Sequence, residues 1–393
     1  VIAGGKKVSE AEIRGVVSPG MLCSVKELGI GEDHSGIWIL PENTLPGQSA
    51  DDFCWLQDTI LDMEITPNRP DALSVIGLAR EIAAILNFPL PQREAEPAPK
   101  LGGYSVSVEN AKDCPLYIAR KFENFSVGES LPRMKTVLSR CGIRSINNLV
   151  DITNFVLLEL GQPLHVFDAD KLEGGCIVVR RAKAGEKILA LDGKTYSLSP
   201  DELIIADAKN PVAIAGVMGG EASAVTAVTR NVLLESAVFD RALVRRARTK
   251  LNLSSESSYR FERGVSRWSA RTGSSLAADF IVKSSGANEC AYGAAGNLSG
   301  GSGDVLLSGK SVSKILGEPV QLSEISESLT KTGVPVKGSG ADTLTVRAPE
   351  WRLDLEIVED FVEEIARVRG YDNTPPSGTW VQLPVRRTVE PQS

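Results

Sequence analysis

The chain has 393 residues, with 43 basic and 50 acidic side chains, a formal net charge of −7 and a pI near 5.2. This length suffices for about two to four domains that each bury a hydrophobic core. The acidic balance argues against a nucleic-acid-binding protein with a basic surface throughout, and no apolar run approaches the ~20 residues of a membrane span. Only two histidines are present, His34 and His165, which excludes most histidine-rich zinc sites.

The six cysteines lie far apart, at positions 23, 54, 114, 141, 176 and 290. No pair has the CxxC spacing of a zinc knuckle or a thioredoxin-type redox site. Scattered cysteines in a long chain are typical of a reducing cytosol. We therefore expect a cytoplasmic protein in which every cysteine is a small buried apolar side chain.

The first hundred residues predict two short units. Residues 1–24 have the pattern of closing strands in a β domain, and because the chain begins at Val1 we expect a fragment. Residues 58–66 predict a strand, and a helix capped by Asp71 follows. The buried face of this helix is predicted to comprise Leu73, Ile76, Ala79, Ala83 and Leu86. The proline-rich segment 88–100 predicts a linker.

The largest unit, 101–295, mixes strands and helices. Its strands are predicted at 104–109, 176–181, 203–207, 211–216 and 231–236, and Asp192–Gly193 predicts a hairpin turn.

Helical periodicity marks four helices in the same unit. One is predicted from Ser130 to Gly142, a second over 147–161, a third from Asp240, and a fourth near 268–285. The apolar side of the second helix comprises Leu149, Ile152, Val156 and Leu160.

A glycine-rich joint at 293–303 precedes a compact α/β unit at 304–372. This unit is predicted to contain helices at 322–331 and 356–368 and a strand at 343–349. We therefore expect a multidomain α+β chain. Its predicted parts are domains at 1–50, 51–100, 101–295 and 296–375, and a tail at 376–393.

Polar residues concentrate around the apolar helix of segment 142–170. Polar side chains in such number beside a helix that must bury one face suggest a lined cavity. They are Arg144, Asn147, Asn148, Asp151, Thr153, Asn154, His165, Asp168 and Asp170. The alternatives are an ordinary core or loop histidine at position 165 and simple helix capping by the two asparagines.

Gly216, Gly219 and Gly220 directly follow an apolar strand, where glycines allow a ligand to approach the backbone closely. Their spacing is not a dinucleotide-binding signature, so on this pattern alone an ordinary turn is the stronger interpretation. Glu235 closes the strand 231–236. At a strand end its carboxylate could receive a ligand hydroxyl, or pair with one of the nearby arginines.

Two clusters of charged residues are further candidate binding sites. Six arginines could form a phosphate-binding patch, although the acidic composition of the chain favours a solvated helix face. They are Arg241, Arg245, Arg248, Arg260, Arg263 and Arg267. Asp360, Glu363 and Glu364 share one helical face, with Asp354 just upstream. Clustered carboxylates suit Mg²⁺, but without other information stabilisation of the helix N-terminus explains them better.

Five segments, in this order, resemble the β subunit of bacterial phenylalanyl-tRNA synthetase. They cover nearly the whole chain and are 62–84, 142–170, 214–223, 254–265 and 351–373. The resemblance implies a central editing domain (B3/B4-like), which removes tyrosine mischarged onto phenylalanine tRNA. It also implies a small α/β winged-helix-like (B5-like) domain after it, and the end of an OB-type tRNA-binding domain before it.

The resemblance also implies partners and site residues. The partners would be tRNA(Phe) and the α subunit, which carries out ATP-dependent phenylalanylation, and Mg²⁺ would bind Asp354, Asp360, Glu363 and Glu364. The implied catalytic residues are His165, Glu235, Asn154 and Thr153. The implied substrate-binding residues are Arg144, Gly216, Gly219, Ser255 and Ser257. Many family members have threonine and alanine where the two serines stand.

In this scheme Glu235 accepts the phenolic hydroxyl of tyrosine, and His165 orients a water or the terminal ribose. An apolar synthetic pocket rejects an added hydroxyl only weakly, whereas a second site that hydrogen-bonds the hydroxyl discriminates strongly. The alternative is a non-catalytic tRNA-binding and assembly scaffold in which the pocket is silent.

Overall fold

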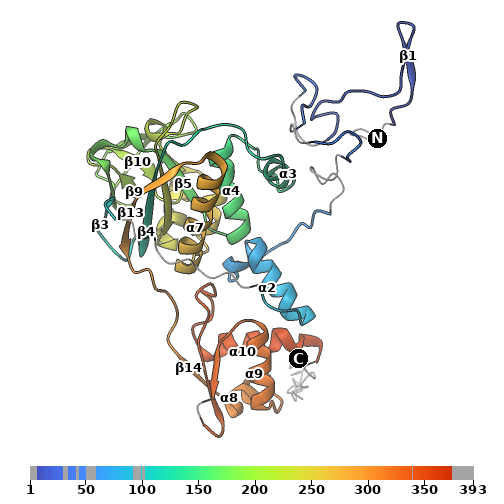
Figure 1. Cartoon of the computed structure of the whole chain (residues 1–393). Coiled ribbons are helices and arrows are strands. Elements are labelled where there is room, and N and C mark those ends of the chain that lie inside the picture. The colour runs from blue at the N-terminus through green and yellow to red at the C-terminus, as the bar shows by residue number, and fades with distance from the viewer. Residues whose placement is uncertain are drawn as a thin grey trace, which may run out of the picture. The chain divides into compact units, whose positions relative to one another are not determined.

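The computed structural model describes residues 7–29, 34–40, 44–49, 59–91, 99, 102–338 and 340–373 (Figure 1). Two compact units are present. The larger comprises 1–79, 91–300 and 350–353, and the smaller comprises 80–90, 301–349 and 354–393. Cys54, most of the expected linker and the expected tail 376–393 lie outside the described residues. Within the described part, no helix is long and apolar enough to cross a membrane.

A four-stranded antiparallel sheet forms the centre of the larger unit, with the strand order β13-β4-β12-β5. Its strands are β4 (Leu116–Glu123), β5 (Leu164–Asp168), β12 (Val232–Val238) and β13 (Asn288–Gly296). Side chains alternate between its two faces. Val166 and Leu234 belong to one hydrophobic core and Phe167 and Leu233 to another, so the sheet is covered on both sides.

Three helices cover one face of this sheet: α3 (Pro132–Arg140), α4 (Asn148–Leu160) and α7 (Arg267–Ser285) (Figure 1). The predicted apolar side of α4 is confirmed, because Leu149, Ile152, Val156 and Leu160 are all buried. The side chain of Asn147 caps the helix by accepting from the backbone N–H groups of residues 149 and 150.

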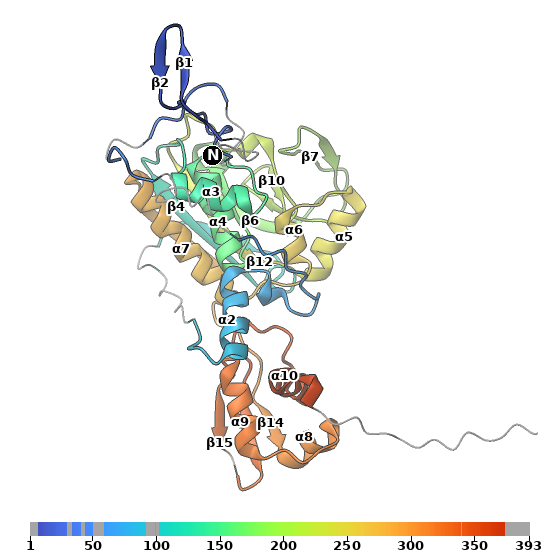
Figure 2. The ribbon, with the colours of Figure 1, turned by 90° about the vertical axis from the view of Figure 1, so that its right-hand side faces the viewer.

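A second sheet packs against the other face, with the order β11-β10-β9-β6-β3. Its strands are β3 (Ser105–Val108), β6 (Cys176–Arg181), β9 (Leu203–Ala206), β10 (Pro211–Ile214) and β11 (Met218–Gly219). Helices α5 (Arg241–Leu251) and α6 (Glu256–Phe261) complete this core, on the side of the unit away from α7 (Figure 2). The predicted hairpin is present as β7 (Lys187–Leu189) and β8 (Thr195–Ser197). The domain is thus two packed sheets with helices outside.

The smaller unit contains a three-stranded sheet and three helices around one core. The sheet has the order β14-β16-β15, with β14 (Val305–Ser308), β15 (Val336–Gly338) and β16 (Thr343–Val346). The helices are α8 (Gly309–Leu316), α9 (Leu322–Lys331) and α10 (Val358–Arg369), followed by the short η6 (Tyr371–Asn373). The predicted helix at 322–331 is confirmed, and the one at 356–368 begins two residues later because Ile357 is its extended N-cap residue.

Several local predictions are wrong. Ser130 does not open α3, because its hydroxyl donates to the carboxylate of Asp151 instead. Asp71 does not cap the next helix, since it pairs with Arg69 inside the short 3-10 helix η2 (Pro70–Ala72). The helix that follows η2 is α2 (Val75–Leu86). Ser74 Oγ accepts a hydrogen bond from the N–H of Gly77 in its first turn.

The expected end of an OB-type domain at 1–50 stays a prediction. The described part before residue 50 contains one hairpin, β1 (Ala11–Ile13) and β2 (Val16–Ser18), and no closed barrel. No strand is assigned over 59–66. The remaining short 3-10 helices are η3 (Ala169–Lys171), η4 (Glu173–Gly175) and η5 (Glu221–Ser223).

The cysteines do not all have the expected environment. Cys114 is buried, but Cys141 is exposed and Cys23, Cys176 and Cys290 are half-buried. The expectation that all are core side chains is therefore wrong for four of the five described cysteines.

Candidate functional site

A small cavity of about 60 Å³ lies between the two sheets of the larger unit. One water needs roughly 10–15 Å³ of such space, so the cavity has room for a few waters or a small chemical group. Residues of β5, β9, β10, β11, β12 and α6 and their connections line it. They are Pro163, Leu164, His165, Ile205, Ala213, Ile214, Gly216, Val217, Met218, Gly219, Glu235, Ser257 and Phe261. Five of the predicted site residues therefore meet in one cavity: His165, Gly216, Gly219, Glu235 and Ser257.

Glu235 provides the buried carboxyl group of this cavity, with only 5% of its surface exposed. It lies in the middle of β12, because the strand continues to Val238, so the prediction that it closes the strand is wrong. Its directly opposed neighbours are His165 on β5 and Ala119 on β4. Opposed residues of an antiparallel pair point to the same face, so Glu235 and His165 enter the cavity side by side.

Tyr117, which sequence reasoning missed, is the hydrogen-bond partner of Glu235. Its hydroxyl donates to Glu235 Oε2 over 2.9 Å, and its side chain is fully buried. The sequence signal that could have pointed to a buried Tyr117 was its place in an apolar run of β4, between Leu116 and Ile118. Among the described residues, Glu235 Oε1 receives no hydrogen bond.

Burial determines the charge of the cavity. Desolvation raises the pKa of Glu235 from 4.5 to about 8, against the smaller lowering effect of the Tyr117 hydrogen bond. Desolvation also lowers the pKa of His165 from 6.5 to about 4. At neutral pH the carboxyl is therefore mostly protonated and the imidazole is neutral. A cavity with these groups favours a neutral hydrogen-bonding ligand over an ion.

The glycines shape the cavity wall. A methyl group on Gly219 would stand 2.5 Å from Cε1 and 2.8 Å from Nε2 of His165, so the imidazole packs directly on this backbone. The imidazole also meets the ring of Phe167 edge-on at 4.5 Å. Gly216 has a φ of +69°, and a methyl group there would crowd Phe261 at 3.0 Å. Both positions thus need glycine for steric reasons.

The two predicted serines at the start of α6 have different surroundings. Ser257 lines the cavity. Ser255 is the N-cap of α6, bonding the N–H of Ser258, and its hydroxyl lies 3.1 Å from the carbonyl oxygen of Val217. Ser255 therefore connects α6 to the glycine turn and is not itself part of the cavity lining.

Three other predicted residues do not line this cavity. Thr153 and Asn154 belong to α4, which packs on the other face of the four-stranded sheet, and the Thr153 hydroxyl donates to the carbonyl of Val150. Arg144 is exposed in the loop between α3 and α4. Their roles in a larger substrate site stay predictions.

The arginine cluster is partly structural. Arg248 and Arg263 both pair with Glu262, over 2.7 and 2.8 Å, and Arg260 pairs with Glu256. Such arginines are already neutralised by neighbours. Arg241 and Arg245 lie on the exposed side of α5 and form no ion pair within the described residues.

The four carboxylates predicted to bind Mg²⁺ do not make a metal centre as they are placed. Asp360 Oδ2 accepts from the backbone N–H groups of Glu356 and Ile357. Glu364 is buried and binds Arg367 through both oxygens, while Glu363 is exposed. Across the described ranges, no group of three or more possible ligands could hold a metal ion. The magnesium site, which also includes Asp354, stays a prediction.

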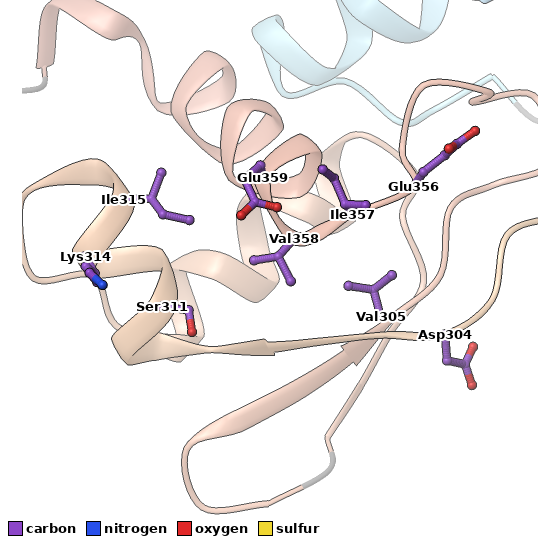
Figure 3. Close-up of a pocket in the computed structure, with 9 residues that line it drawn as sticks. All are labelled: Asp304, Val305, Ser311, Lys314, Ile315, Glu356, Ile357, Val358 and Glu359. Carbon is purple, nitrogen blue, oxygen red and sulfur yellow. The ribbon is translucent and has the colours of Figure 1, made fainter.

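The smaller unit has its own, wider groove of about 730 Å³ (Figure 3). It lies between α8 and the start of α10, with Lys314 and Ile315 on one side and Ile357 and Glu359 on the other. None of the four predicted metal ligands lines it. The groove is thus separate from both predicted sites.

The comparisons with known proteins agree with this division of the chain. The family model described as a B3/4 domain matches residues 113–286, and that described as a tRNA synthetase B5 domain matches 305–371. These matches define a chain assembled from aminoacyl-tRNA synthetase domains.

Curated relatives give the family. Proteins named phenylalanine–tRNA ligase beta subunit from Desulfotalea psychrophila, Anaeromyxobacter dehalogenans and Moorella thermoacetica are 42%, 43% and 42% identical to this chain. The alignments cover 98%, 95% and 95% of this chain and 48%, 47% and 48% of the relatives. The chain belongs to the phenylalanine–tRNA ligase β-subunit family and spans about half the length of these relatives.

One solved structure is also similar, an N-terminal fragment of the phenylalanyl-tRNA synthetase β subunit from Pyrococcus horikoshii. It is 18% identical, with a TM-score of 0.41, over 78% of this chain and 85% of that chain.

Proposed function

We propose that the cavity between the two sheets is the hydroxyl-binding end of an editing site, which binds the tyrosyl group of mischarged Tyr-tRNA(Phe) and promotes its hydrolysis. The observation that carries this proposal is the half-satisfied carboxyl of Glu235. One oxygen is bonded to Tyr117 and the other has no protein partner in the described part of the chain. A buried polar group in this condition favours a ligand that supplies the missing hydrogen bond.

Tyrosine and phenylalanine differ by one hydroxyl, and Glu235 responds to that difference in either protonation state. A protonated carboxyl can donate to the phenolic oxygen, and a carboxylate can accept from the phenolic hydroxyl. A phenyl ring offers neither, so it would leave Glu235 unpaired at a cost of about 1–3 kcal/mol. The neighbouring side chains of Ile205, Ile214 and Phe261 supply the apolar wall that an aromatic ring needs.

His165 acts by positioning in this proposal. With a pKa of about 4, its imidazole is neutral at physiological pH and is a weak base. It can accept a hydrogen bond from a water or from the terminal ribose, both of which must be oriented toward the ester. Because an aminoacyl ester is already reactive, an oriented water suffices without a covalent nucleophile.

The wider function follows from the family. We propose that the chain works in the cytoplasm with tRNA(Phe) and an α subunit that performs ATP-dependent phenylalanylation, and that it does not charge tRNA alone. Arg241, Arg245 and Arg144 are exposed and are the arginines we expect to contact phosphates. Asp360 and Glu364 are engaged in protein contacts and would have to rearrange to bind Mg²⁺.

A deacylation assay with Tyr-tRNA(Phe) tests the proposal. We expect Glu235→Ala to lower kcat/KM by at least about tenfold, while Glu173→Ala, a change at an exposed glutamate of the same unit, has no effect. Equal hydrolysis by wild type and Glu235→Ala would remove Glu235 from the mechanism. Salt-dependent tRNA binding without deacylation at any enzyme concentration would establish the scaffold alternative instead.

A further inference from the structure

Tyr117 and Glu235 form an isolated polar pair inside an otherwise apolar core. They are 118 residues apart in the sequence, and both side chains are buried. The surrounding core is made of apolar side chains from both sheets, such as Ile205 and Phe239. The other titratable groups near this pair are Cys114, Tyr104 and His165.

The register of the sheet explains how the pair forms. Tyr117 lies opposite Ala237, and Glu235 lies opposite Ala119, so the two polar residues are diagonal neighbours on one face. Diagonal neighbours are about 7–8 Å apart, which is within reach of an aromatic side chain. The two alanines occupy the other corners of this square, and their small side chains leave the tyrosine ring room to reach the carboxyl.

We propose that Tyr117 is a positioning and specificity-determining residue, which binds one oxygen of Glu235 and thereby directs the other oxygen toward the ligand hydroxyl in the cavity. This inference rests on the proposed editing function. The bond comes from β4 on one side of β12, whereas His165 of the cavity lining lies on β5 on the other side. Without the tyrosine hydroxyl, the carboxyl could satisfy itself with a trapped water or rotate away from the ligand.

Tyr104 shows that this core does not require a partner for every tyrosine hydroxyl. Its hydroxyl is buried and has no hydrogen-bond partner among the residues that the structure describes, and its ring packs against the same core. The Tyr117 bond is therefore not simply the condition for burying a tyrosine here. Tyr104 also provides a matched control, because Tyr104→Phe deletes a buried hydroxyl that does not touch Glu235.

The experiment compares the hydrolysis of Tyr-tRNA(Phe) with that of Phe-tRNA(Phe) by the full chain and its Tyr117→Phe and Tyr104→Phe variants. We expect Tyr117→Phe to lower the tyrosine-over-phenylalanine ratio of kcat/KM about tenfold, the effect of one hydrogen bond, and Tyr104→Phe to leave it unchanged. In a Glu235→Ala background, Tyr117→Phe should have no further effect on the ratio, because its hydroxyl acts through the side chain at position 235. A thermal melt of each variant confirms folding.

The outcomes separate the inference from the proposed function. If wild type selects tyrosine and Tyr117→Phe selects it equally well, the inference is overturned and the editing proposal stands. If the effect of Tyr117→Phe persists in full in the Glu235→Ala background, Tyr117 does not act through Glu235 and the inference is also overturned. If wild type shows no selection between the two substrates, the proposed function fails, and the inference fails with it.

Discussion

The backbone of Gly219 lies against the imidazole of His165 so closely that a methyl group at position 219 would stand 2.5 Å from the ring. The two residues come from different sheets, β11 and β5. Their contact fixes the distance between the sheets at the cavity. Any side chain at position 219 must displace the imidazole or push the sheets apart.

Gly219→Ala is therefore expected to lower Tyr-tRNA(Phe) deacylation more than tenfold and to destabilise the chain by about 1–3 kcal/mol. Deacylation kinetics and urea denaturation measure the two effects. Gly128→Ala is the control, because a methyl group at Gly128 would meet nothing within 4 Å. If Gly219→Ala kept the wild-type rate of deacylation, the position of the His165 imidazole would not matter for the reaction.

Glu235 should make stability depend on pH in a predictable direction. Because folding raises its pKa from 4.5 to about 8, the folded state binds the proton more tightly than the unfolded state. The contribution of the neutral carboxyl is fully present below the unfolded pKa and is lost as pH rises through the folded pKa. Glu235→Gln cannot ionise, so its free energy of unfolding relative to wild type should increase by roughly 3–5 kcal/mol from about pH 4 to about pH 9.

Urea denaturation of both proteins across this pH range is the measurement. Other groups titrate alike in the two proteins and cancel in the difference. A difference that stays constant with pH would mean that Glu235 ionises normally in the folded chain.

Asp151 should be a major source of stability for the loop that carries Arg144. Its carboxylate is fully buried and accepts from the hydroxyls of Ser130 and Ser145 and from the N–H of Ile146. Asp151→Ala leaves these donors unpaired, and we expect a loss of about 3 kcal/mol. Asp279→Ala, at a surface pair with Lys283, should cost less than about 1 kcal/mol. Similar melting temperatures for the two variants would contradict this account.

Magnesium ions should have little effect on the thermal stability of the chain. Asp360 and Glu364 already accept hydrogen bonds from the protein, so binding would require their rearrangement. We expect millimolar MgCl₂ to leave the melting temperature of wild type unchanged. An increase that disappears in Glu363→Gln, a change at an exposed carboxylate with no structural bond in the described residues, would establish the predicted site.

Helices were predicted well where apolar residues recur with helical periodicity and where capping residues mark both ends. In α4, the four apolar positions, Asn147 as cap and Gly161 as the end are all found. Ser130 failed as a predicted cap because a distant carboxylate, Asp151, binds its hydroxyl. A residue type that caps helices has other hydrogen-bonding options, and tertiary contacts decide among them.

Sequence reasoning selected several residues that lie together in the structure, but it did not predict their geometry. His165, Gly216, Gly219, Glu235 and Ser257 meet in one cavity. Tyr117 was missed because its role depends on strand register across 118 residues, which local patterns do not contain. The same limitation explains why Glu235 was expected at a strand end. A strand with a buried glutamate at its centre departs from the apolar pattern that marks strands, and such departures concentrate at functional sites.

In the proposed editing site, each of the two sheets would supply a different part of substrate recognition. The polar groups that can detect a hydroxyl, on Tyr117, Glu235 and His165, all belong to the four-stranded sheet, whereas Ile205 and Ala213 in the facing wall belong to the other sheet. Substitutions in this wall can therefore change the size and shape of the aromatic ring that the cavity would accept, without changing the groups that would bind its hydroxyl. Evolution or an engineer could retune this pocket toward other hydroxylated aromatic amino acids by substitutions in one sheet alone.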